Sequence, residues 1–180
     1  LMAGNFPVRR MQQRCPKHID GKAGFYSSGN DTSINDGTWE AVKASCMVAQ
    51  QAQKVVATGD VACLALCRPP GHHAGKDLFG GYCFLNNAAV AAQMFLDQGA
   101  EKVAIIDIDF HHGNGTQDIF YERGDVLFAS LHGQPEDSYP YFSGYVCETG
   151  ERDGAGYNFN FPMPSGTRYE TWAQALEQAI

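Results

Sequence analysis

One segment constrains the fold of this 180-residue chain more than any other, because it is apolar, β-branched and runs directly into charged side chains. Lys102–Ile108 predicts a strand, with Asp107, Asp109 and His111 at alternate positions around its carboxyl end. Alternate residues of an extended chain share a face, so these three side chains are expected together and the intervening apolar ones opposite. Aspartate oxygen and histidine nitrogen suit Zn²⁺ or another divalent first-row metal. The segment therefore predicts a metal site that needs at least one further protein ligand.

The remaining periodic segments alternate between helix and strand. The first 36 residues are rich in Gly, Asn, Ser and Pro and predict a loop. A helix is expected from Thr38, its candidate N-cap, to Gly59, its candidate stop. Further helices are predicted over 87–98, 116–122 and 169–180, and strands over 61–67, 102–108, 126–131 and 157–161. This order favours an α/β fold with a mainly parallel sheet.

Composition and charge exclude several classes of protein. Hydrophobic residues make up 44% and charged residues 18%, which supplies a core. The net charge is −7 and no basic cluster exceeds Arg9–Arg10, so no nucleic-acid partner is expected. The longest apolar run, Val61–Cys67, is too short to span a membrane, and no signal-peptide pattern opens the chain. The six cysteines form no C-x-x-C pair and are expected as reduced, mostly buried thiols in the cytoplasm.

A second polar motif, Arg68-Pro-Pro-Gly-His-His-Ala-Gly, directly follows the predicted strand Val61–Cys67. Proline and glycine fix an irregular backbone there, so His72 and His73 are expected on a rigid loop. Two adjacent imidazoles are costly to charge together, which favours one as base and the other as electrostatic helper or acid. Such a pair is also commonly structural, and the metal-type cluster on another strand favours the catalytic interpretation.

Two aromatic segments are candidates for a substrate pocket. Phe79-Gly-Gly-Tyr-Cys-Phe combines paired glycines, which allow close approach to the backbone, with flat apolar side chains. Residues 134–145 carry four further aromatic side chains in a predicted loop. Both segments either line a pocket or pack as ordinary core and turn.

Three motifs resemble the histone deacetylase superfamily: Arg68-Pro-Pro-Gly-His-His-Ala, Phe79-Gly-Gly-Tyr-Cys-Phe-Leu-Asn-Asn-Ala-Ala-Val-Ala and Ile106-Asp-Ile-Asp-Phe-His-His-Gly-Asn-Gly-Thr. Within it, the bacterial acetylpolyamine amidohydrolases are most similar, through Phe6-Pro-Val-Arg-Arg, Asp36-Gly-Thr-Trp-Glu-Ala and Gln117-Asp-Ile-Phe-Tyr-Glu-Arg-Gly-Asp-Val. The resemblance implies an arginase-like three-layer α/β fold with a mainly parallel sheet, here incomplete. Residues 1–180 are then part of one catalytic domain, with a loop-rich segment 1–37 and a central α/β portion 38–180.

The resemblance also assigns roles to individual residues. Asp109 and His111 match two of the family's three protein zinc ligands, and His72 and His73 match its tandem catalytic histidines. Support for the histidines is implied from Asp107 and Asn114, and the tunnel wall from Gly81, Tyr82 and Tyr139. A structural K⁺ site is implied at Asp107, Asp109, His111, Ser130 and Leu131, and a second monovalent-cation site at Phe120, Arg123, Val126 and Tyr157.

The activity implied is zinc-dependent hydrolysis of the acetyl amide of N-acetylated polyamines, which releases acetate and a free amine. Fe²⁺ or Co²⁺ can use the same ligands. The expected partner is a small acetylated amine, with a homodimer by family analogy and no membrane. The family pattern places a second ligand aspartate and an oxyanion-stabilising tyrosine beyond Ile180, so a fragment is expected. Two alternatives stay open: a protein or histone lysine deacetylase, and a non-catalytic metal- or polyamine-binding fragment.

Overall fold

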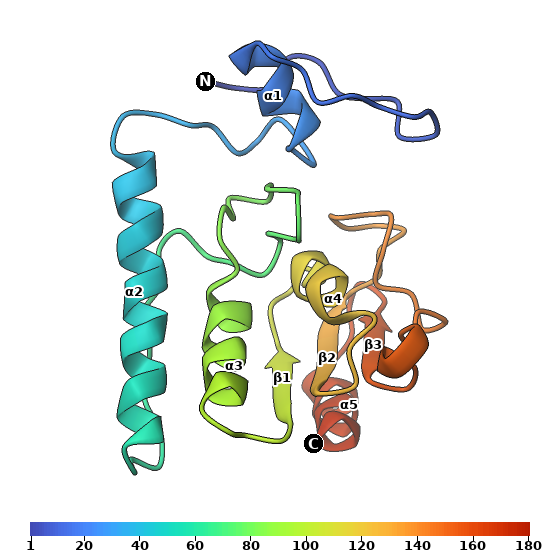
Figure 1. The fold of residues 1–180 in the computed structure, drawn as a ribbon. Helices are drawn as coiled ribbons and strands as arrows, with labels where there is room; N and C mark the ends of the chain where they lie inside the picture. The colour runs from blue at the N-terminus through green and yellow to red at the C-terminus, as the bar shows by residue number, and fades with distance from the viewer. The chain divides into compact units, whose positions relative to one another are not determined.

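The structure is a computed structural model that describes residues 1–180. It forms two compact units, Leu1–Val90 and Ala91–Ile180. The first unit contains helices α1 (Ile19–Phe25) and α2 (Thr38–Ala57), and α3 (Asn87–Asp97) crosses from the first unit into the second (Figure 1). None of the helices is long and apolar enough to cross a membrane.

The second unit is built on a three-stranded parallel sheet in the order β1-β2-β3 (Figure 1). The strands are β1 (Val103–Asp107), β2 (Val126–Gly133) and β3 (Asn158–Met163). Helix α4 (Asn114–Phe120) connects β1 to β2, the short 3-10 helix η1 (Arg152–Gly154) precedes β3, and α5 (Tyr169–Ala179) follows it. The expected α/β class with a parallel sheet is confirmed.

Strand β2 forms the core of this unit because it has a strand on each side and both α4 and α5 pack against it. Val126, Phe128 and Leu131 are at most 2% exposed. Strand β1 lies at the edge of the sheet, and Ile106 is 37% exposed. The apolar residues of β1 are therefore only partly buried.

The prediction that Val61–Cys67 forms a buried strand is wrong. The segment is irregular, and Val61, Leu64 and Leu66 are at least 80% exposed. Cys63 is also exposed. An extended segment becomes a strand only when a neighbour completes its hydrogen-bond ladder, and no strand is found within the first unit. The apolar pattern of one segment does not show whether a neighbouring strand is present to pair with it.

Smaller differences concern helix ends. Helix α1 lies inside the segment predicted as a loop. Gly37, at φ 82°, is the N-cap of α2 in place of Thr38, whose hydroxyl instead accepts from the Asn35 N–H at 2.9 Å. Helix α4 begins two residues earlier than predicted. All six cysteines are free. Cys83 is buried as expected, whereas the prediction of a buried thiol is wrong for Cys63, which is exposed because its segment is not a strand.

Candidate metal centre and catalytic loops

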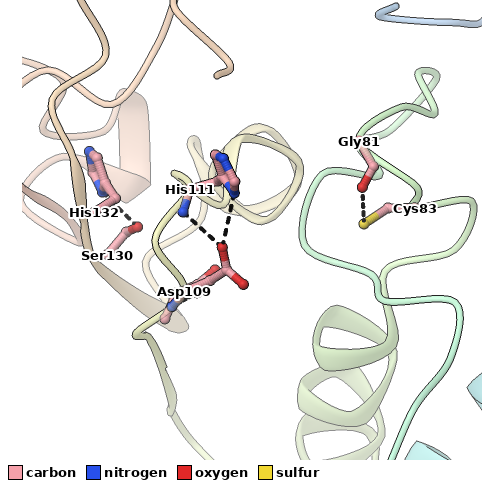
Figure 2. Close-up of polar contacts among 7 residues, drawn as sticks. Gly81, Cys83, Asp109, His111, Ser130 and His132 are labelled. Carbon is pink, nitrogen blue, oxygen red and sulfur yellow. Dashed lines mark hydrogen bonds and ion pairs between the residues drawn. The ribbon is translucent and has the colours of Figure 1, made fainter. Parts of the chain in front are cut away.

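The predicted metal-binding pair lies just beyond the carboxyl end of β1. Strand β1 ends at Asp107, and the chain then turns, so Asp109 and His111 do not alternate along an extended strand as predicted. The Asp109 carboxylate accepts the His111 backbone N–H at 2.7 Å, and its Oδ1 lies 3.4 Å from His111 Nδ1 (Figure 2). Both side chains are about half exposed, at 52% and 44%. A carboxylate oxygen and an imidazole nitrogen thus stand side by side and accessible, which fits two ligands of a first-row metal.

Asp107 is held in the turn that precedes this pair. Its Oδ1 accepts the Asp109 backbone N–H at 3.1 Å. Its Oδ2 lies against Gly113, where an added Cβ would be only 2.3 Å away. A side chain at position 113 would therefore displace the carboxylate, which explains the need for glycine there.

The residues implied for the first monovalent-cation site belong to neighbouring strands. Asp107 on β1 pairs in register with Ser130 on β2, and Leu131 follows it. Ser130 is fully buried, and its hydroxyl lies 2.8 Å from His132 Nδ1 (Figure 2). The other ring nitrogen of His132 lies 2.9 Å from the Gly144 carbonyl, which can only accept.

Burial lowers the pKa of His132, which favours its neutral form. A neutral ring that donates from Nε2 accepts at Nδ1, so Ser130 donates its proton there. The lone pairs of the Ser130 oxygen then remain for another partner, which fits a cation. The sequence interpretation missed His132, although the Ser-Leu-His order around Leu131 is a signal for it.

The second predicted cation set surrounds the start of β2. Phe120 and Val126 are at most 3% exposed. The Phe120 carbonyl accepts the Arg123 N–H at 2.9 Å, and the Tyr157 carbonyl accepts the Phe128 N–H at 2.8 Å. Each carbonyl oxygen has a second lone pair, so these bonds leave acceptor capacity.

The histidine loop lies in the first unit. The His72 and His73 ring centroids are 4.0 Å apart, and the planes are inclined by 43°. His73 is only 4% exposed, whereas His72 is half-buried. The two rings therefore lie against each other on this loop, and their catalytic roles stay a prediction.

The loop is fixed by polar residues that the sequence interpretation did not assign. The Pro69 carbonyl accepts from the Ser45 hydroxyl at 2.7 Å and from the Asn87 amide at 3.3 Å. Asn86 donates to the Ala74 carbonyl at 3.1 Å. An added Cβ on Gly71 would lie 2.6 Å from the Asn87 nitrogen. The Leu-Asn-Asn sequence at the start of α3 thus anchors the histidine loop. Its two adjacent side-chain amides are the feature of the sequence from which this anchor could have been predicted.

The glycine-aromatic motif forms a tight turn. Gly80 and Cys83 exchange backbone hydrogen bonds of 3.1 and 2.9 Å, and both Gly81 (φ 54°) and Tyr82 (φ 66°) are left-handed. Cys83 is fully buried and donates its thiol proton to the Gly81 carbonyl at 3.4 Å (Figure 2). Tyr82 is 64% exposed. A positive φ is strained for a tyrosine, and such strain is concentrated at functional sites.

Tyr139 and Asn114 lie in the second unit. The Tyr139 ring meets the His111 ring edge to face, with centroids 6.1 Å apart. Asn114 begins α4, and its N–H donates to the His112 carbonyl at 2.9 Å.

The predicted residues are divided between the two units. The histidine pair and the Gly81–Tyr82 turn belong to the first unit, and the predicted metal-binding pair, the two cation sets and Tyr139 belong to the second. No group of three or more His, Cys, Asp or Glu side chains is arranged to hold a metal ion. Asp109 and His111 therefore stay predicted ligands.

The chain thus combines a parallel sheet with an Asp–His pair at its edge and tandem histidines, which agrees with the motifs of the histone deacetylase family. The chain belongs to the histone deacetylase family, because residues 7–180 match the family described as "Histone deacetylase domain".

Particular relatives are acetylpolyamine amidohydrolases. The chain is 56% identical over 179 residues to the acetylpolyamine amidohydrolase of Mycoplana ramosa, with 99% of this chain and 52% of that protein covered. It is 55% identical to acetylpolyamine amidohydrolase 2 of Pseudomonas aeruginosa, with 97% of this chain and 51% of that protein covered. The crystal structure of the acetylpolyamine aminohydrolase from Burkholderia pseudomallei matches with a TM-score of 0.92 and 40% identity, covering 99% of this chain and 51% of that one. The chain therefore spans about half the length of these relatives.

Proposed function

We propose that this chain forms part of a metal-dependent deacetylase that hydrolyses the acetyl amide of N-acetylated polyamines. The observation that carries this proposal is the accessible Asp109–His111 pair, 3.4 Å apart at the end of β1. It occurs in a histone deacetylase family chain that is 55–56% identical to proteins named acetylpolyamine amidohydrolases.

Asp109 and His111 are the residues that hold the metal in this proposal. Zn²⁺ suits this oxygen and nitrogen donor set, and Fe²⁺ or Co²⁺ can use it too. When bound, such a metal polarises the acetyl carbonyl and lowers the pKa of the attacking water. The half exposure of both side chains supports the assignment because a catalytic metal needs an open position.

His73 acts as general base and removes a proton from the attacking water. His72, its neighbour at 4.0 Å, is the electrostatic partner, and a proton is returned to the leaving amine so that it departs neutral. His73 is the more buried of the two rings, at 4% exposed, and is held in place by its surroundings. Asp107 and Asn114 are proposed as supporting residues of the reaction.

Monovalent cations are proposed to stabilise the edge of the sheet. The first site uses Asp107, Asp109, His111, Ser130 and Leu131, and the second uses Phe120, Arg123, Val126 and Tyr157. Support for the first site is the buried Ser130 hydroxyl, whose proton is directed to His132 and whose lone pairs remain.

The substrate is proposed to be a small acetylated amine that contacts Gly81, Tyr82 and Tyr139. Flat aromatic side chains suit the methylene chain of a polyamine, and the net charge of −7 favours encounter with a cation. An acetylated lysine side chain of a protein also carries an acetyl amide on a methylene chain. An acetylated polyamine and an acetyl-lysine peptide must therefore be compared directly.

The test measures bound zinc and acetate release on the desalted chain, with N-acetylputrescine and an acetyl-lysine peptide as substrates. Retained zinc and hydrolysis of the small amine would support the proposal, and His73→Ala should then lower the rate of acetate release at least about a hundredfold. Hydrolysis of the peptide alone would assign the chain to a protein deacetylase. A chain that retains no zinc and releases no acetate would contradict catalysis by these residues and favour the non-catalytic alternative.

A further inference from the structure

A buried polar cluster in the second unit has no part in the proposed chemistry. It joins α4, β3 and the loop of residues 134–150, which carries Tyr139. Its centre is Gln117 on α4, and Asn158 and Asn160 come from β3. These three side chains are 3–8% exposed. Polar groups this deeply buried are retained only with partners, and here the partner from the loop is Glu148.

Glu148 fixes the orientation of the Gln117 amide and so the direction of the hydrogen bonds that this amide makes. A carboxylate only accepts, so the Gln117 amide must turn its NH₂ group toward Glu148 Oε2, at 2.7 Å. The Gln117 oxygen then points the other way and accepts from Asn158 at 2.9 Å and from Asn160 at 2.8 Å. Each asparagine leaves its own Oδ1 buried without a partner, which is a cost that the Nδ2 bonds must exceed.

The same oxygen of Glu148 also holds the loop backbone. Glu148 Oε2 accepts the Gly144 N–H at 2.8 Å, and the Gly144 carbonyl accepts from His132 Nε2 at 2.9 Å. Gly144 has φ +105°, and an added Cβ would lie 2.7 Å from His132 Nε2 and 2.8 Å from His112 Cγ. The loop therefore lies directly against two buried imidazoles at this point, where only glycine fits.

Contacts continue from this anchor toward Tyr139. Asn160 Nδ2 donates to the Tyr145 carbonyl at 3.2 Å, and the Tyr145 hydroxyl donates to the Tyr141 carbonyl at 3.1 Å. The Tyr141 ring meets the Tyr139 ring edge to face at 6.5 Å, and Tyr139 meets His111 at 6.1 Å. A short series of contacts thus connects the buried cluster to the aromatic ring beside the metal-binding pair.

We propose that Glu148 is a positioning residue: through Gln117 and the Gly144 N–H it fixes the 134–150 loop and thereby the ring of Tyr139. The part of this inference that concerns substrate rests on the proposed function of Tyr139. The hydrogen bonds to Glu148 are charge-assisted and replace contacts with water in a partly exposed position. Without its side chain, Gln117 and Gly144 each lose an acceptor and the loop loses its attachment to α4.

The test compares Glu148→Ala with Glu148→Gln and with the control Glu151→Ala, whose exposed side chain lies close by in sequence. All three hydrogen bonds to the Glu148 carboxylate, from Gln117, the Gly144 N–H and Asn160, end on Oε2, so a glutamine can place its single oxygen there and preserve them. We expect amide hydrogen exchange at Gly144 to accelerate at least about tenfold in Glu148→Ala, because the Gly144 N–H then loses its acceptor. Glu148→Gln should stay within about threefold of the parent chain, and Glu151→Ala should match it.

The amides of β2 report whether an effect is local. Unchanged Gly144 exchange in Glu148→Ala would overturn the proposal, and so would an equal acceleration throughout β2, because that indicates a general loss of stability. Failure of glutamine to rescue the loop would also overturn it. In the acetate assay we expect Glu148→Ala to raise KM for N-acetylputrescine with kcat nearly unchanged. Absence of turnover in the parent chain would count against the proposed function, while the exchange rates would still decide the role of Glu148.

Discussion

At the scale of single residues, the geometry near β1 depends on close approaches that leave no room for a side chain. Gly113 permits the Asp107 carboxylate to lie beside it, and Asp107 in turn holds the backbone of the turn that carries Asp109. The spacing of Asp107, Asp109 and His111 in the sequence predicted a metal site. It did not predict the turn, because an alternating pattern does not reveal that side-chain to backbone bonds will end the strand at Asp107.

Gly113→Ala tests this arrangement. The new methyl group would meet Asp107 Oδ2 at 2.3 Å and Phe128 at 3.1 Å, although the backbone φ of −75° suits alanine. We expect a loss of about 1–3 kcal/mol in the free energy of unfolding, measured by urea denaturation. Gly4→Ala is the control because nothing lies within 4 Å of its Cβ, and it should change stability by less than about 0.5 kcal/mol. Equal stability of the two variants would show that Asp107 is not held as described.

At the scale of elements, local signals predicted several helices and strands well. The ranges of α2, β2 and α5 follow from periodicity and their flanking residues. Val61–Cys67 has an equally clear apolar pattern and is not a strand, because no neighbour completes its hydrogen bonds. Pairing depends on residues distant in sequence, which a local pattern does not contain.

This difference between pattern and pairing gives a prediction for two apolar positions of similar sequence character. Leu64 is 82% exposed, whereas Phe128 on β2 is 1% exposed. Leu64→Lys should change the free energy of unfolding of this chain by less than about 0.5 kcal/mol. Phe128→Ala should cost about 3–5 kcal/mol because it leaves a cavity beside His112 and Gly113. A large loss from Leu64→Lys in the denaturation experiment would mean that the segment is packed after all.

At the scale of the whole molecule, three long motifs identified the family from sequence, and the match over residues 7–180 confirms it. The fold class is confirmed as well. The buried cluster around Gln117 and Glu148 could not be predicted, because residues 31 positions apart in sequence meet only after α4 and the 134–150 loop pack together. The catalytic and metal-binding assignments remain predictions that chemistry must test.

The most direct test of the central claim is the visible absorption spectrum of this chain during titration with Co²⁺, which uses the same ligands as Zn²⁺ and is coloured. The account predicts a d–d absorption band that saturates at one Co²⁺ per chain and is lost in both Asp109→Asn and His111→Ala. The same titration with Gly4→Ala should match the parent chain. An unchanged band in both ligand variants, or no band in the parent chain, would contradict the assignment of Asp109 and His111 as the metal-binding pair.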